Sequence, residues 1–382
     1  MSEEQVRPAT AGSEAGWGSA RVTIACQRCG RAHYVVRDHP PQRCPFCMQG
    51  PLQEQQAGAP PAAPEMVLPL SVTPARMRAA LAEWTRGLWL RPPDMTAEML
   101  CARAQPVFIP TWLVDARVQG RWRAEIGFDY QAVSFEERYG EGQGWRSRER
   151  LETRVRWEPR LGRFERRYEN VSVPALDDQR ALPAAWQQYD PSRALAATAE
   201  VLAGAAVLVP TLAPATAPDP GEGAAPSAWP EAERLLRRAA EADCLRASGG
   251  QHIRAFALQA RYSDLHWTLL LLPAWVSWYS EGGRVWPVFI NGQTGAVSGA
   301  RCASASAART VGIVIGVLGL ALVLAGMLLA IIGLVVPPVA VVGTVLALVG
   351  VAVLILAVLP PLWARAHNRR VLGELPLPLG ED

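Results

Sequence analysis

The chain has 382 residues, a formal net charge of +3 and 38 basic residues, all of them arginine. The absence of lysine excludes a phosphate-loop lysine and a Schiff-base lysine, and arginine is too basic to replace lysine in proton transfer. A Walker-type nucleotide hydrolase is therefore excluded, and the length leaves room for one or two soluble domains beside a membrane segment.

Two Cys-x-x-Cys pairs lie near the N-terminus, Cys26 with Cys29 and Cys44 with Cys47. This spacing is typical of one zinc ion held by four thiolates, which saturate the ion and make it structural. Two disulfides are the alternative, and a cytosolic location disfavours them. The scattered cysteines are expected to be plain thiols: Cys101, Cys244 and Cys302.

Turns and charge complete the description of this zinc ribbon. Gly30 and Gly50 follow the two pairs, where a left-handed backbone is often needed. We expect His33 and His39 to lie on the ribbon surface and not to bind the metal. The ribbon is basic but has few aromatic side chains, so nucleic-acid binding is an alternative that is not favoured.

The soluble body combines predicted helices with predicted strands. Thr73 caps a helix that runs to about Gly87, and further helices are predicted over 181–202 and 231–247. Strands are predicted over 107–115, 120–133, 150–158, 164–173, 253–262, 266–279 and 285–290, with turns at 159–162 and at Gly282-Gly283. This order predicts an α+β body with an antiparallel sheet.

The segment from Arg150 to Glu158 alternates cleanly between apolar and charged side chains. One face carries Leu151, Thr153, Val155 and Trp157, and the other carries Arg150, Glu152, Arg154 and Arg156. A solvated face with cross-strand ion pairs is the favoured interpretation. Contact with anionic lipid headgroups is the alternative.

The C-terminal stretch from Val311 to Leu362 contains Thr344 as its one polar side chain. As a single helix it would be far longer than the ~30 Å hydrocarbon core, so Pro337-Pro338 is expected to divide it into two transmembrane helices. Arginines flank the outer ends of the two helices, and the turn between the helices has none. The positive-inside rule therefore predicts an inner-membrane protein with both termini in the cytoplasm.

Glycines recur every seven residues along both predicted helices and predict a close helix–helix seam. Folding the chain back at Pro337-Pro338 gives these pairs: Gly333 with Gly343, Gly326 with Gly350, and Gly319 with Ala357.

The predicted domain organisation follows from these features. It comprises a disordered segment at 1–20, the zinc ribbon at 21–51, a linker at 52–64, a first part of the α+β domain at 65–202, an Ala/Pro-rich insertion at 203–230, a second part at 231–300, the hairpin at 311–362 and a cytoplasmic tail at 363–382.

Several motifs occur in one order along the chain: the four-cysteine ribbon, Phe108 to Ala116, Tyr189-Asp-Pro191, Leu272 to Trp275, and Asn291 to Gly295. Together they resemble a family of bacterial membrane-anchored zinc-ribbon proteins often labelled replication factor Y or primosomal helicase-like. The resemblance implies a ribbon, a soluble body and an anchor. The last motif is also similar to a turn in PepSY-type binding domains.

No catalytic motif is recognisable, so we expect a non-enzymatic, membrane-anchored scaffold that binds a protein partner. A membrane-tethered nucleic-acid binder and an enzyme with a pocket in the sheet are the alternatives. Asp264 and His266 are a conceivable catalytic pair, but a surface Asp and a half-buried His are expected. Aromatic side chains and one acid are candidates for a pocket, although they are more often core: Trp112, Asp115, Trp275, Trp278 and Tyr279.

Overall fold

A computed structural model defines the fold. Contacts divide the chain into unit 1 (1–110, 178–209 and 271–382) and unit 2 (111–177 and 210–270). The structure describes residues 17, 21–38, 40–41, 43–55, 63–140, 144–177, 188–202, 204–214, 226–332 and 334–373.

Unit 1 is built on a sheet in the order β11-β10-β9-β5-β8-β2-β1-β3, to which β4 and β7 are added at the side. The sheet is mixed, and not antiparallel throughout as predicted, because β5 and β8 run parallel where Val107 pairs with Ala206. A long connection separates these two strands, and it allows the chain to return in the same direction. The strands are β1 (Arg21–Cys26), β2 (Ala32–Val36), β3 (Leu52–Glu54), β4 (Met66–Val67), β7 (Leu195–Ala196), β8 (Ala206–Leu208), β10 (Arg284–Asn291) and β11 (Val297–Gly299), with residues 105–110 of β5 (Gln105–Gly140) and 271–281 of β9 (His252–Glu281).

Two helices cover part of this sheet, α2 (Pro74–Thr85) and α3 (Ala97–Ala102). Thr73 caps α2 as predicted, because its side chain accepts a hydrogen bond from the backbone nitrogen of Arg76. The helices bury apolar side chains against β9 and β10, and the resulting core contains Met77, Leu81, Leu100, Tyr279, Val288 and Ile290.

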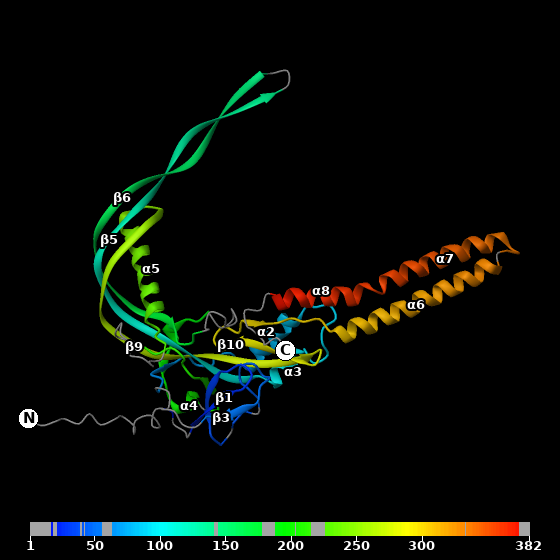
Figure 1. The fold of residues 1–382 in the computed structure, drawn as a ribbon, viewed down its shortest axis with the longest axis horizontal. Coiled ribbons are helices and arrows are strands. Elements are labelled where there is room, and N and C mark those ends of the chain that lie inside the picture. The colour runs from blue at the N-terminus through cyan, green and yellow to red at the C-terminus, as the bar shows by residue number, and fades with distance from the viewer. Residues whose placement is uncertain are drawn as a thin grey trace, which may run out of the picture. The chain divides into compact units, whose positions relative to one another are not determined.

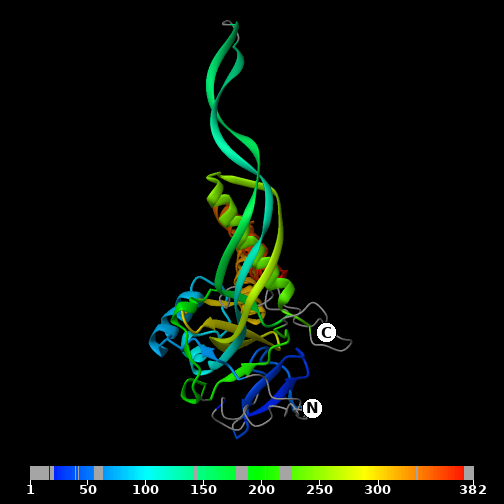
Figure 2. The ribbon, with the colours of Figure 1, turned by 90° about the vertical axis from the view of Figure 1, so that its left-hand side faces the viewer.

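Unit 2 consists of the outer parts of β5 and β9, all of β6 (Gly144–Pro174), and α5 (Trp229–Ser248). Figure 1 shows α5 lying along the curved sheet that β5, β6 and β9 form. The helix buries a stripe of small and apolar side chains that includes Ala232, Leu236 and Ala240. In Figure 2, β5 and β6 continue past the end of β9 and wind around each other.

Strands that the sequence divides into short pieces are continuous in the structure. The expected turn at 159–162 is wrong, because Pro159 pairs with Glu125 and the register continues to Gly140 and Gly144. Proline is tolerated here because β5 is the one partner of β6 among the strands that the structure describes, so an N–H group is dispensable on the other side of β6. The turn at Gly282 and Gly283 is confirmed, and both residues have positive φ.

The C-terminal stretch forms α6 (Ala305–Ile332), α7 (Pro337–Leu356) and α8 (Leu359–Gly373), and Figure 1 shows α6 beside α7. Two helices, Ala305–Ile332 and Pro337–Val371, are long and apolar enough to cross a membrane. Their outer faces expose large apolar side chains, among them Ile313, Leu328 and Leu348.

The glycine seam exists, but its predicted register is wrong by one seven-residue step. The facing pairs are Gly326 with Gly343, Gly319 with Gly350, and Gly312 with Ala357. The two prolines occupy the first turn of α7, so the chain reverses before them. Gly333, which was paired in the prediction, lies outside the described residues.

Three segments that the structure describes only in part contain elements that were not predicted for them. Trp17, in the segment expected to be disordered, is buried with its ring centroid 4.8 Å from that of Tyr34. The described end of the helix predicted over 181–202 contains a 3-10 turn (Pro191–Arg193), β7 and only a short α4 (Ala199–Leu202), because Asp190 caps that turn. The segment 203–230 contributes buried strand β8 to the sheet.

Candidate metal centre

Two equivalent turns present the four cysteines. The backbone nitrogen of Gly30 donates to the carbonyl of Cys26, and the nitrogen of Met48 donates to the carbonyl of Cys44, both at 3.0 Å. The residues after the pairs are left-handed, with φ of 71° at Gly30 and 58° at Met48. The prediction is thus confirmed at Gly30, whereas Met48, and not Gly50, has this role in the second turn.

The four sulfur atoms lie within 4.8 Å of one another. The Sγ atoms of Cys26 and Cys47 are 3.6 Å apart, and those of Cys29 and Cys44 are 3.7 Å apart. Tetrahedral bonds of ~2.3 Å place neighbouring sulfurs roughly 3.8 Å apart, whereas a disulfide would bring them to about 2.05 Å. All four cysteines are free, and their arrangement fits one metal ion.

Gly50 has a steric role beside the metal ligands. A Cβ atom at this position would lie 2.3 Å from the Sγ of Cys26 and 2.9 Å from the Cβ of Arg28. Both distances are shorter than van der Waals contact. The chain can pass the first pair of ligands only because residue 50 has no side chain.

Backbone N–H groups lie beside the sulfur of Cys44, and hydrogen bonds favour the thiolate at Cys47. The backbone nitrogens of Phe46 and Cys47 each lie 3.4 Å from the Sγ of Cys44. Hydrogen bonds from Cys29, then Cys44, and from the backbone at Gln49 and Gly50 lower the pKa of Cys47. Donors that stabilise the charged sulfur also favour its binding to a cation.

His33 is part of this centre, and its predicted surface location is wrong. It is fully buried, with Nε2 3.4 Å from the Sγ of Cys44. Burial lowers the pKa of His33 to about 4, so the ring is neutral and can donate one N–H to the thiolate. The side chain is enclosed because β2 pairs on both sides, placing His33 opposite Ile24 and Leu208. His39 lies outside the described residues.

The second cysteine turn packs against the body of unit 1. Phe46 is 2% exposed, and its ring centroid lies 5.7 Å from that of Phe289. Gln49 donates to the carbonyl of Val285 at 2.5 Å, and the guanidinium of Arg43 lies 4.8 Å from the ring centre of Trp278. A metal that holds this turn therefore also holds the packing against β9 and β10.

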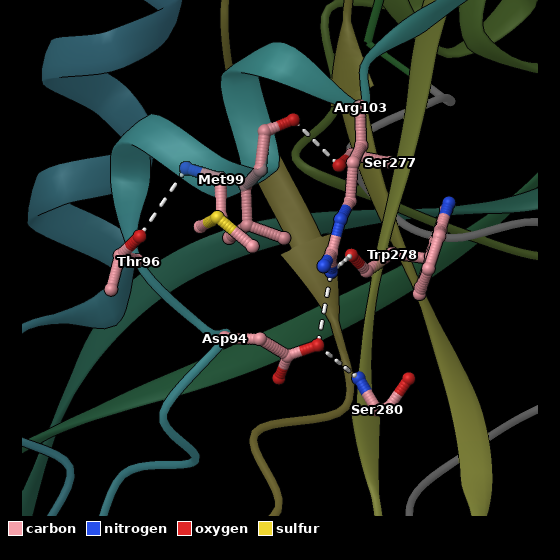
Figure 3. A network of polar contacts seen from close by, with 8 residues as sticks. Asp94, Thr96, Met99, Arg103, Ser277, Trp278 and Ser280 are labelled. Atoms are coloured by element: carbon pink, nitrogen blue, oxygen red, sulfur yellow. Dashed lines mark hydrogen bonds and ion pairs between the residues drawn. The ribbon is translucent and has the colours of Figure 1, made fainter.

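Figure 3 shows the polar network that fixes α3 and Trp278 on β9. Arg103 donates to the Asp94 carboxylate at 3.0 Å and to the carbonyl of Trp278 at 3.1 Å. Its guanidinium also lies 4.0 Å from the Trp278 ring centre, so two arginines contact this indole. Thr96 caps α3, and Ser277 donates to the carbonyl of Leu100.

The candidate catalytic pair lies on the surface of unit 2. Asp264 is 55% exposed and forms an ion pair with Arg117 at 3.0 Å, and His266 is exposed. The surface location predicted for Asp264 is confirmed, whereas the half-burial predicted for His266 is wrong, because its side chain is exposed on β9.

The candidate pocket residues are mainly structural. In unit 1, the buried Tyr279 hydroxyl donates to the carbonyl of Ala300 and accepts from the nitrogen of Cys302. Trp275 is partly buried against the same core. In unit 2, Trp112 donates to the carbonyl of Leu212, and Asp115 accepts from the nitrogen of Asn170.

The remaining cysteines are free thiols, as expected. Burial raises the pKa of Cys244 and of Cys302 to about 11, so both are protonated near neutral pH. Unit 1 also contains a cavity of about 170 Å³ next to the ribbon. Backbone polar groups contribute to its surface, although Gln105 is the one residue among those lining it with a polar side chain; the others include Val35, Pro41, Pro45 and Ala206.

No family model, curated protein or solved structure matches this chain. The resemblance to the membrane-anchored zinc-ribbon family therefore remains a hypothesis that rests on the motifs themselves.

Proposed function

We propose that this chain is a non-enzymatic interaction protein, anchored in a bacterial inner membrane with both termini in the cytoplasm, that presents a β-ribbon to a protein partner. The outer ribbon, defined as residues 130–140 of β5 and 144–154 of β6, carries this proposal. Its strands pair from Tyr130 opposite Arg154 to Gly140 opposite Gly144. In the described part of the chain they have no third strand beside them.

The outer ribbon exposes apolar side chains on one face. Val133 is 55% exposed, its cross-strand neighbour Leu151 is 69% exposed, and Phe135 is 63% exposed. Burying each of these side chains would contribute about 1.5–3 kcal/mol. Since an isolated two-stranded ribbon is only marginally stable in water, a partner on this face would stabilise it.

The opposite face is basic and would favour a partner with acidic residues. On the outer ribbon it carries Arg150 and Arg154 with Glu152 between them, and Arg156 follows on the same face of β6. Two of these form ion pairs within β6, Arg154 with Glu152 at 3.5 Å and Arg156 with Glu158 at 2.9 Å. Such exposed pairs are weak, so they compete little with a partner's carboxylates.

The candidate metal centre supports a structural role for the N-terminal zinc ribbon, residues 21–51, which is distinct from the outer ribbon. We propose that the ion is zinc, because four thiolates at tetrahedral spacing are its usual structural ligand set. The buried second turn is in contact with β9 and β10 and is not available to a partner. The zinc would therefore hold unit 1 together, and the partner would bind elsewhere.

In-cell crosslinking followed by mass spectrometry tests the proposal. Val133→Ser/Leu151→Ser should remove a defined protein that is attached to the wild type, whereas Leu195→Ser, at an exposed apolar position in unit 1, should retain it. An unchanged set of attached proteins in the double variant would rule out the outer ribbon as the binding surface.

A nucleic-acid binder is the second candidate, favoured by the arginines and the exposed Tyr130 on the basic face. Two-stranded ribbons of this kind fit the major groove of DNA. Duplex affinity should then fall steeply with salt, and Arg150→Gln/Arg154→Gln should reduce the salt slope by about two. A salt-insensitive or undetectable interaction would remove this candidate.

A further inference from the structure

The loop between α2 and α3 contacts the polar end of the helical hairpin. The ring of Trp89 lies 4.8 Å from the ring of Trp363, centre to centre, in an edge-to-face arrangement. The backbone nitrogen of Ser304, just before α6, donates to the carbonyl of Leu90 at 2.7 Å. The loop, the start of α6 and the first turns of α8 thus form one structure within unit 1.

Trp363 marks a level along the hairpin. The apolar stretch ends at Leu362, and the exposed Arg365 follows Trp363 by two residues. Ala364 is buried against Ala308, which precedes the exposed Arg309 on α6. Tryptophans at such a boundary lie where acyl chains meet headgroups. Because Trp89 contacts Trp363, it lies at the same level.

The loop backbone exposes Trp89 between two anchored neighbours. Leu88 packs against the α2–α3 core, and Leu90 packs against the buried alanines at the start of α6. Trp89 between them is 48% exposed. Leu90 has a φ of 57°, which is uncommon for a leucine and turns the chain sharply at this point.

Positive charge surrounds this tryptophan. Arg86 and Arg91 flank it in sequence and both are exposed. The carbonyl of Arg86 accepts a hydrogen bond from Arg301 at 2.5 Å, which ties the loop to the segment before α6. Glu83, which pairs with Arg86, is 70% exposed, so water screens this contact.

We propose that residues 86–91 form a membrane-interface site that embeds Trp89 at the level of the lipid headgroups and binds anionic phospholipids through Arg86 and Arg91. This inference rests on the proposed membrane anchor and adds a specific contact to it. Arg309 and Arg365, at the base of the helices, supply further positive charge for the same headgroups. The site would fix the orientation of unit 1 on the bilayer, because a loop and a hairpin would then contact it together.

Photo-crosslinking of the full chain in vesicles of phosphatidylglycerol and phosphatidylcholine tests this site. The aromatic photoprobe p-benzoylphenylalanine replaces Trp89, Leu348 on α7 as a positive control, or the exposed Leu195 as a negative control. Lipid adducts are expected at positions 89 and 348 and not at 195. Adducts at 348 without adducts at 89 overturn the inference and leave the anchor intact, whereas no adducts at 348 contradict the anchor itself.

The preference for anionic lipid tests the arginines separately. With the probe at position 89, Arg86→Gln and Arg91→Gln should each lower the ratio of phosphatidylglycerol to phosphatidylcholine adducts about five-fold. Arg238→Gln, an exposed position on α5, should leave the ratio unchanged. A ratio that also stays constant in the two loop variants would overturn the proposed headgroup recognition.

Discussion

Substituting Gly50 by alanine is the sharpest test of the metal centre. The new methyl group would lie 2.3 Å from the Sγ of Cys26. Relieving this clash moves the sulfur by about 1 Å, to roughly 3.5 Å from the methyl carbon. A metal site tolerates ligand shifts of only about 0.2 Å, so Cys26 would be lost as a ligand.

The expected loss of affinity follows from the free energy of a structural zinc site, about 10–16 kcal/mol shared among four ligands. Losing one ligand therefore costs about 3 kcal/mol, or ~100-fold in Kd. Gly30→Ala is the matched control, because its Cβ would meet nothing within 4 Å. Its positive φ costs roughly 1–2 kcal/mol, which limits the effect to about ten-fold or a little more.

The assay is competition for zinc between the detergent-solubilised full chain and a chromophoric chelator. Cobalt substitution adds a spectrum that reports the number of thiolate ligands. If Gly50→Ala binds zinc as tightly as the wild type, the proposed packing of residue 50 against a metal ligand is refuted. If the wild-type chain binds no stoichiometric zinc or cobalt, the metal assignment itself fails.

Three further predictions concern the hairpin, the core of unit 1 and its thiols. Gly326→Leu should lower the melting temperature in detergent, because its Cβ would lie 2.4 Å from the facing backbone, whereas Gly316→Leu, with only an ordinary contact at 3.7 Å, should not. Tyr279→Phe should cost about 2–4 kcal/mol of stability, seen as a lower melting temperature, because it leaves two buried backbone groups unpaired. Peptide mapping after maleimide treatment at neutral pH should find Cys101 labelled before Cys302. Because the pKa of Cys302 is raised to about 11, its labelling should accelerate as the pH rises. Early labelling of Cys302 would contradict its burial.

Local patterns in the sequence identify the four cysteines of the candidate metal site but not what surrounds them. The spacing of the cysteines directly predicts four converging sulfurs, because each Cys-x-x-Cys pair closes its own turn. His33 has no such local signature. It is buried because β8, far along the chain, pairs with β2 next to it, and a histidine in a short strand carries no signal of that second neighbour. Met48 is buried and has a positive φ, which is uncommon for a residue other than glycine, so its residue type carries no signal for this turn.

The length of strands was underestimated for a related reason. Alternation along β6 is clear from Arg150 to Glu158, and Pro159 with Gly162 then resembles a turn. In the structure both residues pair with β5, opposite Glu125 and Trp122. Proline and glycine end a strand only where the backbone adopts a turn conformation at them, and an edge strand can include both residues. The faces of the ribbon were predictable from the alternation, whereas its reach past β9 depends on where β9 begins.

The helical hairpin shows most clearly the difference between what a local sequence pattern predicts and what depends on contacts between distant segments. Glycine periodicity predicts that a seam exists, because only small residues allow the helices to approach closely. The same periodicity is satisfied equally well in any register shifted by seven residues, so it cannot choose among them. The register depends on where the chain reverses direction between the two helices. Because the prolines already belong to the first turn of α7, the residues before Val336, the N-cap of that helix, make the reversal. A crosslink joining the faces at Gly319 and Gly350, and not those at Gly326 and Gly350, would distinguish the observed register from the predicted one.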